Sequence, residues 1–151
     1  MKALSLTQPW ATLVAIGAKK YETRSWSTKY RGPLYIHAAK RFPVSMEMLA
    51  LYHEPFKSAL GGLALRLPRG AIIAVADLTG CFKTPPDGWP MHPHGGFGDG
   101  LPQSPQERAF GDYSPGRYAW HLENVRALPE PIPWKGQLGL FNMPDLKAVS
   151  P

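Results

Sequence analysis

The chain has 151 residues, of which 44% are hydrophobic and 19% charged, and its formal net charge is +6. This length and composition are typical of one ordinary folded domain, which excludes a disordered chain and leaves too little sequence for two comfortable domains. The 17 prolines and 15 glycines predict many turns and a chain that leans towards β structure. Cys81 is the only cysteine, which excludes an intramolecular disulfide and favours a reducing, intracellular setting.

The first two predicted elements are a short strand and a helix. Residues 3–6 alternate apolar and polar side chains, as a strand does. Residues 9–16 then follow the apolar spacing of a buried helix face. Thr7 or Gln8 can cap this helix, and Gly17 is a good residue to end it.

A charged signature follows the helix. The pattern G-x-K-x-x-E-x-R is formed by Gly17, Lys19, Glu22 and Arg24. Residues 21–26 alternate and predict a second strand, in which residues i and i+2 share a face about 6.6 Å apart. Glu22 and Arg24 therefore point the same way and can reach one ligand, or each other.

Apolar periodicity in the rest of the chain predicts mostly strands. Further strands are expected at residues 34–38, 71–79, 118–123 and 138–141, and a helix at 45–52. Residues 84–105 are rich in proline and glycine with almost nothing to bury, so this long loop is either a functional lid or disordered. Periodicity alone indicates an α+β domain, mostly β.

Several motifs in this order resemble the ASCH domain family, which belongs to the PUA-like β-barrel superfamily. The resemblance is carried by Leu4-Ser5-Leu6, Gln8-Pro9-Trp10-Ala11, the G-x-K-x-x-E-x-R signature, Arg31-Gly32-Pro33-Leu34 and His37-Ala38. It resumes at Tyr118-Ala119-Trp120 and at Pro131-Ile132-Pro133-Trp134-Lys135-Gly136. It implies a single ASCH domain over residues 1–151, of α+β class: a small PUA-like β-barrel with two or more flanking helices.

The basic excess lies in the segment that contains the signature. Residues 1–41 hold eight Lys and Arg residues against Glu22 as the one acidic residue. Such a block fits an anionic partner, with nucleic acid first in line. Aromatic residues interleave with these cations, and single-stranded nucleic acid is bound by charge for its phosphates and stacking for its bases. A solvated basic face with no partner is the alternative.

In ASCH-like proteins the signature positions line a cleft between barrel and helix, and this implies a binding site here. The residues expected to bind nucleic acid are Lys19, Lys20, Glu22, Arg24, Trp26, Lys40 and Arg41, with Ser5, Trp10 and His37 as neighbours in the cleft. We expect Lys19 and Arg24 to contact phosphate or a base carbonyl, and Glu22 to orient them or to accept from a base amino group. These three side chains are expected to converge on one solvent-open concavity. RNA is expected more than DNA, and a nucleoside or nucleotide is a further candidate.

Two other interpretations of the signature remain open. Glu22 can pair with Arg24 as a structural latch, although an exposed pair contributes only about 0–1 kcal/mol. Some ASCH-like proteins are amidohydrolases that act on acylated cytidine, and one lineage is described as a ribonuclease. A metal-independent hydrolase would use Lys19 and Glu22 as its catalytic pair. In the small amidohydrolases, however, a threonine takes the position of Glu22.

No cofactor and no metal is expected. His92 and His94 flank a stiff proline, and only Asp87 and Asp99 are close in sequence, so metal binding there is not favoured.

The early apolar run from residue 10 to residue 18 is interrupted on its N-terminal side by polar residues and ends in two lysines, unlike a signal peptide. The chain is therefore expected to be cytoplasmic, with no membrane partner.

Overall fold

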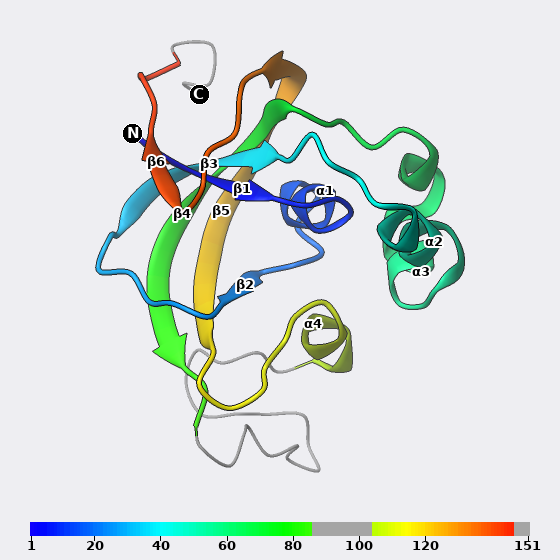
Figure 1. Cartoon of the computed structure of the whole chain (residues 1–151), viewed down its shortest axis with the longest axis horizontal. Helices are drawn as coiled ribbons and strands as arrows, with labels where there is room; N and C mark the ends of the chain where they lie inside the picture. Colours follow the sequence, from blue (N-terminus) through cyan, green and yellow to red (C-terminus); the bar gives the residue numbers. More distant parts are fainter. Residues whose placement is uncertain (86–103, 147–151) are drawn as a thin grey trace.

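A curled six-stranded sheet forms the body of the molecule in the computed structural model, which describes residues 1–85 and 104–146 (Figure 1). The strands are β1 (Lys2–Leu6), β2 (Tyr21–Arg24), β3 (Gly32–Ala38), β4 (Ala71–Lys83), β5 (Tyr118–Pro133) and β6 (Leu140–Asn142). Their order across the sheet is β2-β5-β4-β3-β1-β6. β1 and β3 run parallel, and the other neighbouring pairs are antiparallel. The long strands β4 and β5 curl strongly, which gives the sheet the shape of a half-barrel.

Helices cover one side of the curl (Figure 1). They are α1 (Trp10–Ala15), α2 (Val44–Tyr52), α3 (Phe56–Leu60), the 3-10 helix η1 (Gly61–Leu65) and α4 (Pro105–Ala109). α1 lies between the sheet and the other helices because it is apolar on two sides. Ala11 and Val14 join the main core of the sheet, whereas Leu13 packs in a separate cluster that contains Phe56 and Phe110.

The two faces of β1 and β3 have different neighbours, and this positions the site. Leu4, Leu6, Leu34 and Ile36 point into the main core, which also holds the fully buried Trp120. The alternate residues point to the opposite face, as the two-residue period of a strand requires. There a second cluster is built from Ala3, Tyr35, Ile72, Val75, Phe141 and Met143.

On that second face Ser5 and His37 come next along their strands. They are directly paired in the parallel register of β1 and β3, so their side chains lie next to each other at the end of the second cluster.

The α+β class with several flanking helices is confirmed, and most predicted elements are present. The N-cap of α1 is Pro9 rather than Thr7 or Gln8, but Gln8 Oε1, one residue earlier, accepts a hydrogen bond from the Thr12 N–H at 3.0 Å. The strand predicted over residues 71–79 continues to Lys83, and the one predicted over 118–123 continues to Pro133. The second strand is shorter than predicted and ends at Arg24.

Most of the predicted loop at 84–105 lies outside the described residues, which exclude 86–103 and 147–151, and its last residue begins α4. In the described part of the chain, no helix combines the length and the apolar character needed to cross a membrane.

Candidate nucleic-acid interface

A concavity with a volume of about 880 Å³ lies beside the C-terminal ends of β1 and β3. Its lining comes from five separate segments: Ser5 and Thr7, Arg24, residues 37–41 apart from Ala38, Arg69 with Gly70, and residues 134–139. It is thus built from chain segments that are far apart in sequence.

Backbone hydrogen bonds hold four of these segments together, and only the Arg24 segment is outside this set. The Ala39 N–H donates to Leu6 O at 2.9 Å, which extends the pairing of β1 and β3 past its end. The Gly70 N–H donates to Ala38 O at 2.8 Å, and Gly70 O accepts from the Trp134 N–H at 3.0 Å. Gly70 therefore ties the chain after β3 to the chain after β5, and the basic side chains beside these residues meet on one surface.

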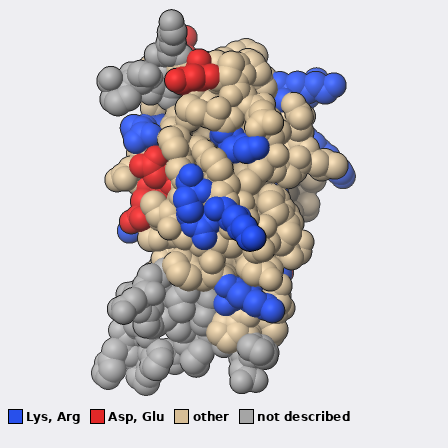
Figure 2. Space-filling model, turned by 90° about the vertical axis from the view of Figure 1, so that its left-hand side faces the viewer, with Lys and Arg blue, Asp and Glu red and all other residues tan. Residues whose placement is uncertain are grey.

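The concavity is strongly basic. Its lining contains five cationic side chains, and no acidic residue is found among the described residues that line it; the five are Arg24, Lys40, Arg41, Arg69 and Lys135. Arg24 is half-buried, and the other four are exposed at the rim. Lys and Arg also gather near the middle of the face that points left in Figure 1, where Asp and Glu lie mainly towards one edge (Figure 2). A concavity lined by one sign of charge raises the local concentration of ligands of the opposite sign, so an anionic ligand fits here.

A buried histidine forms part of the floor. The His37 ring is 1% exposed; its Nδ1 lies 2.9 Å from Ser5 Oγ and its Nε2 lies 2.8 Å from Trp134 O. Gly136 approaches so closely that an added Cβ would lie 2.7 Å from His37 Cε1. This position therefore requires glycine for lack of space. Ser5 and His37 line the same concavity as Arg24.

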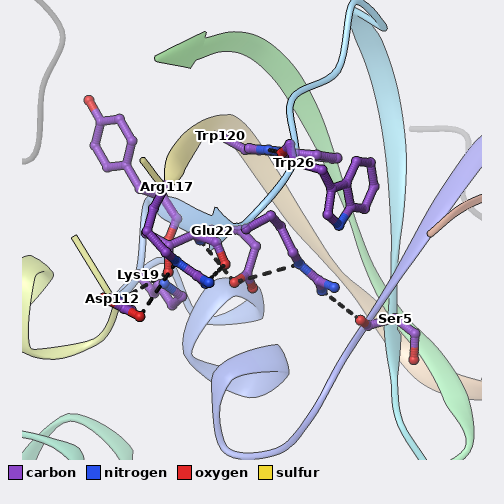
Figure 3. Close-up of polar contacts among 10 residues, drawn as sticks. Ser5, Lys19, Glu22, Trp26, Asp112, Arg117 and Trp120 are labelled. Carbon is purple, nitrogen blue, oxygen red and sulfur yellow. Dashed lines mark hydrogen bonds and ion pairs between the residues drawn. The ribbon is translucent and has the colours of Figure 1, made fainter. Parts of the chain in front are cut away.

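Arg24 reaches the concavity from β2. Its Nη2 donates to the backbone oxygen of Ser5 at 2.8 Å, and its Nε lies 4.0 Å from Glu22 Oε1 (Figure 3). Glu22 Oε1 also accepts from the Thr23 N–H at 2.9 Å. The shared face predicted for Glu22 and Arg24 is thus observed, and the latch between them is present as a long ion pair.

Lys19 lies in the interior. Its side chain is 1% exposed, and Nζ donates to the backbone oxygen of Tyr21. Burial lowers the pKa of the Lys19 amine, while the negative charges of Glu22 and Glu107 oppose this shift. The ammonium lines neither the basic concavity nor the smaller one described next, so this conformation gives it no direct contact with a ligand there.

Glu22 and Trp10 line a second concavity of about 330 Å³, together with Thr23 and residues 109–112. The expectation that Lys19, Glu22 and Arg24 converge on one open concavity is therefore wrong. Arg24 is long enough to reach past Glu22 to Ser5, whereas Glu22 is turned back to its own strand by the Thr23 N–H, and Lys19 is drawn inward by Tyr21 O.

The remaining predicted residues occupy different settings. Trp26 is partly buried, packs edge-on against Trp120 at a ring distance of 4.7 Å, and lines neither concavity (Figure 3). Lys20 is exposed beside the buried Lys19, and its described hydrogen bonds are made by its backbone: the N–H donates to Glu107, and the oxygen accepts from the Leu122 N–H at 2.8 Å. In the parts of the chain that the structure describes, no three His, Cys, Asp or Glu side chains are grouped as a metal site would require. His92 and His94 lie outside those residues.

Three residues near the signature were missed by the sequence reasoning. Arg69 and Lys135 join the concavity only through the Gly70 contacts. Lys135 belongs to the Pro131–Gly136 motif of the family resemblance, whereas no sequence pattern indicated a role for Arg69. Glu107 is 5% exposed and its carboxylate accepts from the backbone N–H groups of Lys20 and Tyr21 at 2.9–3.0 Å. Burial raises the pKa of the Glu107 carboxyl, and the N–H of Lys20 and the charge of Lys19 oppose this rise.

Comparison with known proteins identifies the family. The sequence profile of the ASCH domain matches residues 4–132. This chain belongs to the ASCH domain family. Activating signal cointegrator 1 from Homo sapiens and from Mus musculus are each 35% identical to it over 84 residues. That alignment covers 53% of this chain and 14% of each cointegrator, so this ASCH chain spans only a small part of the length of those relatives.

A solved ASCH structure has the same fold. A point mutant of ZmASCH from Zymomonas mobilis superposes with a TM-score of 0.54 at 15% sequence identity, over 97% of this chain and 91% of that one. The identity is low, so this likeness bears on the fold alone. It confirms the PUA-like architecture expected from the sequence.

Proposed function

We propose that this ASCH domain binds nucleic acid, with RNA or another flexible single strand as its first ligand. The observation that carries the proposal is the 880 Å³ concavity with five cationic side chains and no acidic one among its described lining residues. Phosphate contacts supply most of the affinity of such interfaces. Membership of a family generally proposed to bind RNA supports the same direction.

The size of the concavity favours an unpaired base over a duplex. A volume of about 880 Å³ lies within the range of small-molecule sites and can take a nucleotide, while the cations at the rim face outward to the flanking phosphates. Bases can enter such a site only when they are not stacked in a helix, and sequence-specific RNA recognition mostly targets unpaired bases. A free nucleotide would use the same contacts.

Residues of the signature take separate roles in this proposal. Arg24 presents a guanidinium, which carries five N–H donors, to the phosphate or to a base carbonyl beside Ser5. Lys40 and Arg41 bind the phosphates at the rim together with Arg69 and Lys135. Lys20 extends the basic surface, and Lys19 and Glu22 support the strand that carries Arg24.

The hydrolase alternative depends on Lys19 and Glu22 acting together on a substrate. A general base must come within hydrogen-bond reach of the proton it takes, and the burial of the Lys19 ammonium disfavours this. We expect purified protein to show weak or no hydrolysis of acylated cytidine and of labelled RNA. Robust turnover that is lost in both Lys19→Ala and Glu22→Ala would replace the binding proposal with the hydrolase.

The binding test uses two double variants with the same loss of charge. Arg69→Ala/Lys135→Ala removes one Arg and one Lys from the rim of the concavity, and Arg66→Ala/Lys57→Ala removes the same pair from exposed positions outside it. Fluorescence anisotropy with labelled single-stranded RNA, single-stranded DNA and duplex RNA is the measurement. We expect the rim variant to bind single strands about tenfold or more weakly and the control to bind like the wild type.

Equal weakening in both variants would show a response to total charge alone and would contradict the assignment of the concavity. Absence of binding to all three nucleic acids at low salt would contradict the proposed function itself.

A further inference from the structure

The proposed function leaves open what the Ser5–His37 pair does on the floor of the concavity. We infer that Ser5 is locked by His37 as a hydrogen-bond acceptor and selects bases that present an exocyclic amine, such as cytosine, over bases that present a carbonyl there, such as uracil. This inference rests on the proposed function, because it concerns the base that enters the concavity.

The first step is the tautomer of His37. Its Nε2 lies 2.8 Å from the backbone oxygen of Trp134, which has no proton to donate, so Nε2 carries the hydrogen of this bond. In a neutral imidazole the other nitrogen is then an acceptor. Nδ1 lies 2.9 Å from Ser5 Oγ, so the Ser5 hydroxyl donates its proton to His37. A serine hydroxyl has one proton, and here it is engaged inside the protein.

The second step is the rigidity of this arrangement. His37 is 1% exposed and is the register partner of Ser5 on the neighbouring strand. Gly136 lies against its ring, with space too tight for a Cβ. The Ser5 backbone is held as well, because its oxygen accepts from Arg24 Nη2 at 2.8 Å. The Ser5 side chain is therefore fixed while Ser5 itself remains partly exposed in the lining.

The third step is the chemistry of the surroundings. Arginine and lysine side chains offer donors and no acceptor, so the five cations attract phosphates and carbonyl groups. Glu22, the acceptor expected from the sequence, lines the other concavity. Ser5 Oγ keeps lone pairs that a donor on the ligand can use. An amine at that point gains a hydrogen bond, whereas a carbonyl would face an oxygen that has no proton left to give.

Cytosine and uracil form the matched pair for this selection. They share ring size and differ at one edge, where cytosine has an amine donor and uracil a carbonyl acceptor. The Ser5 acceptor selects between bases and not between ribose and deoxyribose, because a ribose 2′-hydroxyl can both donate and accept hydrogen bonds. One neutral hydrogen bond corresponds to a preference of about three- to tenfold.

The test compares the full chain binding to oligocytidylate and oligouridylate of equal length, at one salt concentration and neutral pH. We expect the wild type to prefer oligocytidylate by about three- to tenfold and Ser5→Ala to bind both equally. Ser5→Thr keeps the hydroxyl and should retain the preference. His37→Gln can still donate to Trp134 O but releases the Ser5 proton, so it should lose the preference between the two oligomers. An abasic sugar–phosphate oligomer measures, for each protein, how much of the binding comes from phosphate contacts alone.

The outcomes separate this inference from the proposed function. Equal binding of the two oligomers by the wild type, or a preference that survives in Ser5→Ala, overturns the inference while binding through the rim cations stands. A preference that survives in His37→Gln overturns the locking role of His37. Failure of the wild type to bind any of the three oligomers at low salt overturns the proposed function and the inference with it.

Discussion

Tyr21 shows how one buried side chain makes the stability of this domain depend on pH. Its ring is 6% exposed and stacks on the His121 ring at a centroid distance of 4.5 Å. Burial raises the pKa of the Tyr21 hydroxyl from 10.0 to about 12, with smaller contributions from the charges of Glu107 and Glu123. Between these two pKa values the unfolded chain has released this proton and the folded chain still holds it.

We therefore expect the Tyr21 hydroxyl to lower the free energy of unfolding as the pH rises from about 10 to about 12, because the folded state binds the extra proton. Tyr21→Phe keeps the ring and removes the proton, so its stability should fall less steeply over this interval. Denaturant unfolding of both proteins at a series of alkaline pH values is the measurement. If the free energy of unfolding falls equally steeply with pH in both proteins, the Tyr21 hydroxyl is not the group responsible.

Gly136 shows how close contact at a single Cα holds the site in shape. An added Cβ would lie 2.7 Å from Cε1 and 3.0 Å from Nδ1 of His37, and 3.3 Å from Ser5 Oγ. Gly136→Ala should lower the free energy of unfolding by about 1–3 kcal/mol, as overpacking of a buried contact does. It should also weaken nucleic-acid binding by displacing the His37 ring.

Gly62→Ala is the matched control for this substitution, because in the described part of the chain no atom beyond its immediate neighbours along the backbone lies within 4 Å of its added Cβ. Thermal and denaturant unfolding of both variants provide the comparison. A Gly136→Ala protein as stable as Gly62→Ala would show that the His37 ring is free to move.

At the scale of elements, α4 holds the start of β2 through a single carboxylate. Ser104 caps the helix by accepting from the Glu107 N–H at 3.0 Å, and Glu107 in turn accepts from the N–H groups of Lys20 and Tyr21. These two groups stand where the chain enters β2, the strand that carries Arg24. A short helix near residue 107 thus positions a side chain more than eighty residues earlier.

Glu107→Ala should lower the free energy of unfolding by about 2–4 kcal/mol, because two backbone N–H groups lose their acceptor and the buried Lys19 loses a neighbouring negative charge. Glu107→Gln keeps one acceptor oxygen and should lose less. Glu130→Ala, at an exposed position of β5, should stay within about 0.5 kcal/mol of the wild type. Equal stability of Glu107→Ala and Glu130→Ala in urea unfolding would rule out the anchoring role.

For the whole molecule, the arrangement of charge matters more than its total. The chain carries 17 Lys and Arg residues against 11 Asp and Glu residues, and several cations are paired on the surface, including Arg117 with Asp112 and Arg126 with Asp77. The concavity gathers five cations without an acidic residue in its described lining. Long-range attraction of a polyanion should therefore centre on that part of the surface.

The salt dependence of binding measures how many of these cations contact phosphates. Each phosphate neutralised on a single strand contributes about −0.7 to the slope of log K against log salt, so engagement of all five cations gives a slope near −3.5. We expect Arg69→Ala/Lys135→Ala to reduce the magnitude of the slope by about 1.4 and Arg66→Ala/Lys57→Ala to leave it unchanged. Anisotropy titrations over a range of salt concentrations test this, and an equal loss of slope in both variants would contradict it.

Local sequence periodicity was sufficient for the strands, for α1 and α2, and for which side chains share a face, but it did not predict the short helices α3, η1 and α4. A strand places i and i+2 on one side whatever surrounds it, so the pairing of Glu22 with Arg24 was predictable. Helix α1 was equally predictable from its apolar spacing, and the ordered motifs identified the family and its fold.

Tertiary structure alone decided where the three charged side chains of the signature lie: Lys19 in the interior, Glu22 at the smaller concavity and Arg24 at the basic one. Whether Lys19 points into solvent or into the interior depends on Tyr21 O and on Glu107, a residue far away in sequence, and no local pattern encodes that contact. Arg69 and Lys135 meet Arg24 only because Gly70 bridges the ends of β3 and β5. The residue types and their spacing therefore determined a basic ASCH domain, whereas long-range backbone hydrogen bonds and burial determined which of its charges face a ligand.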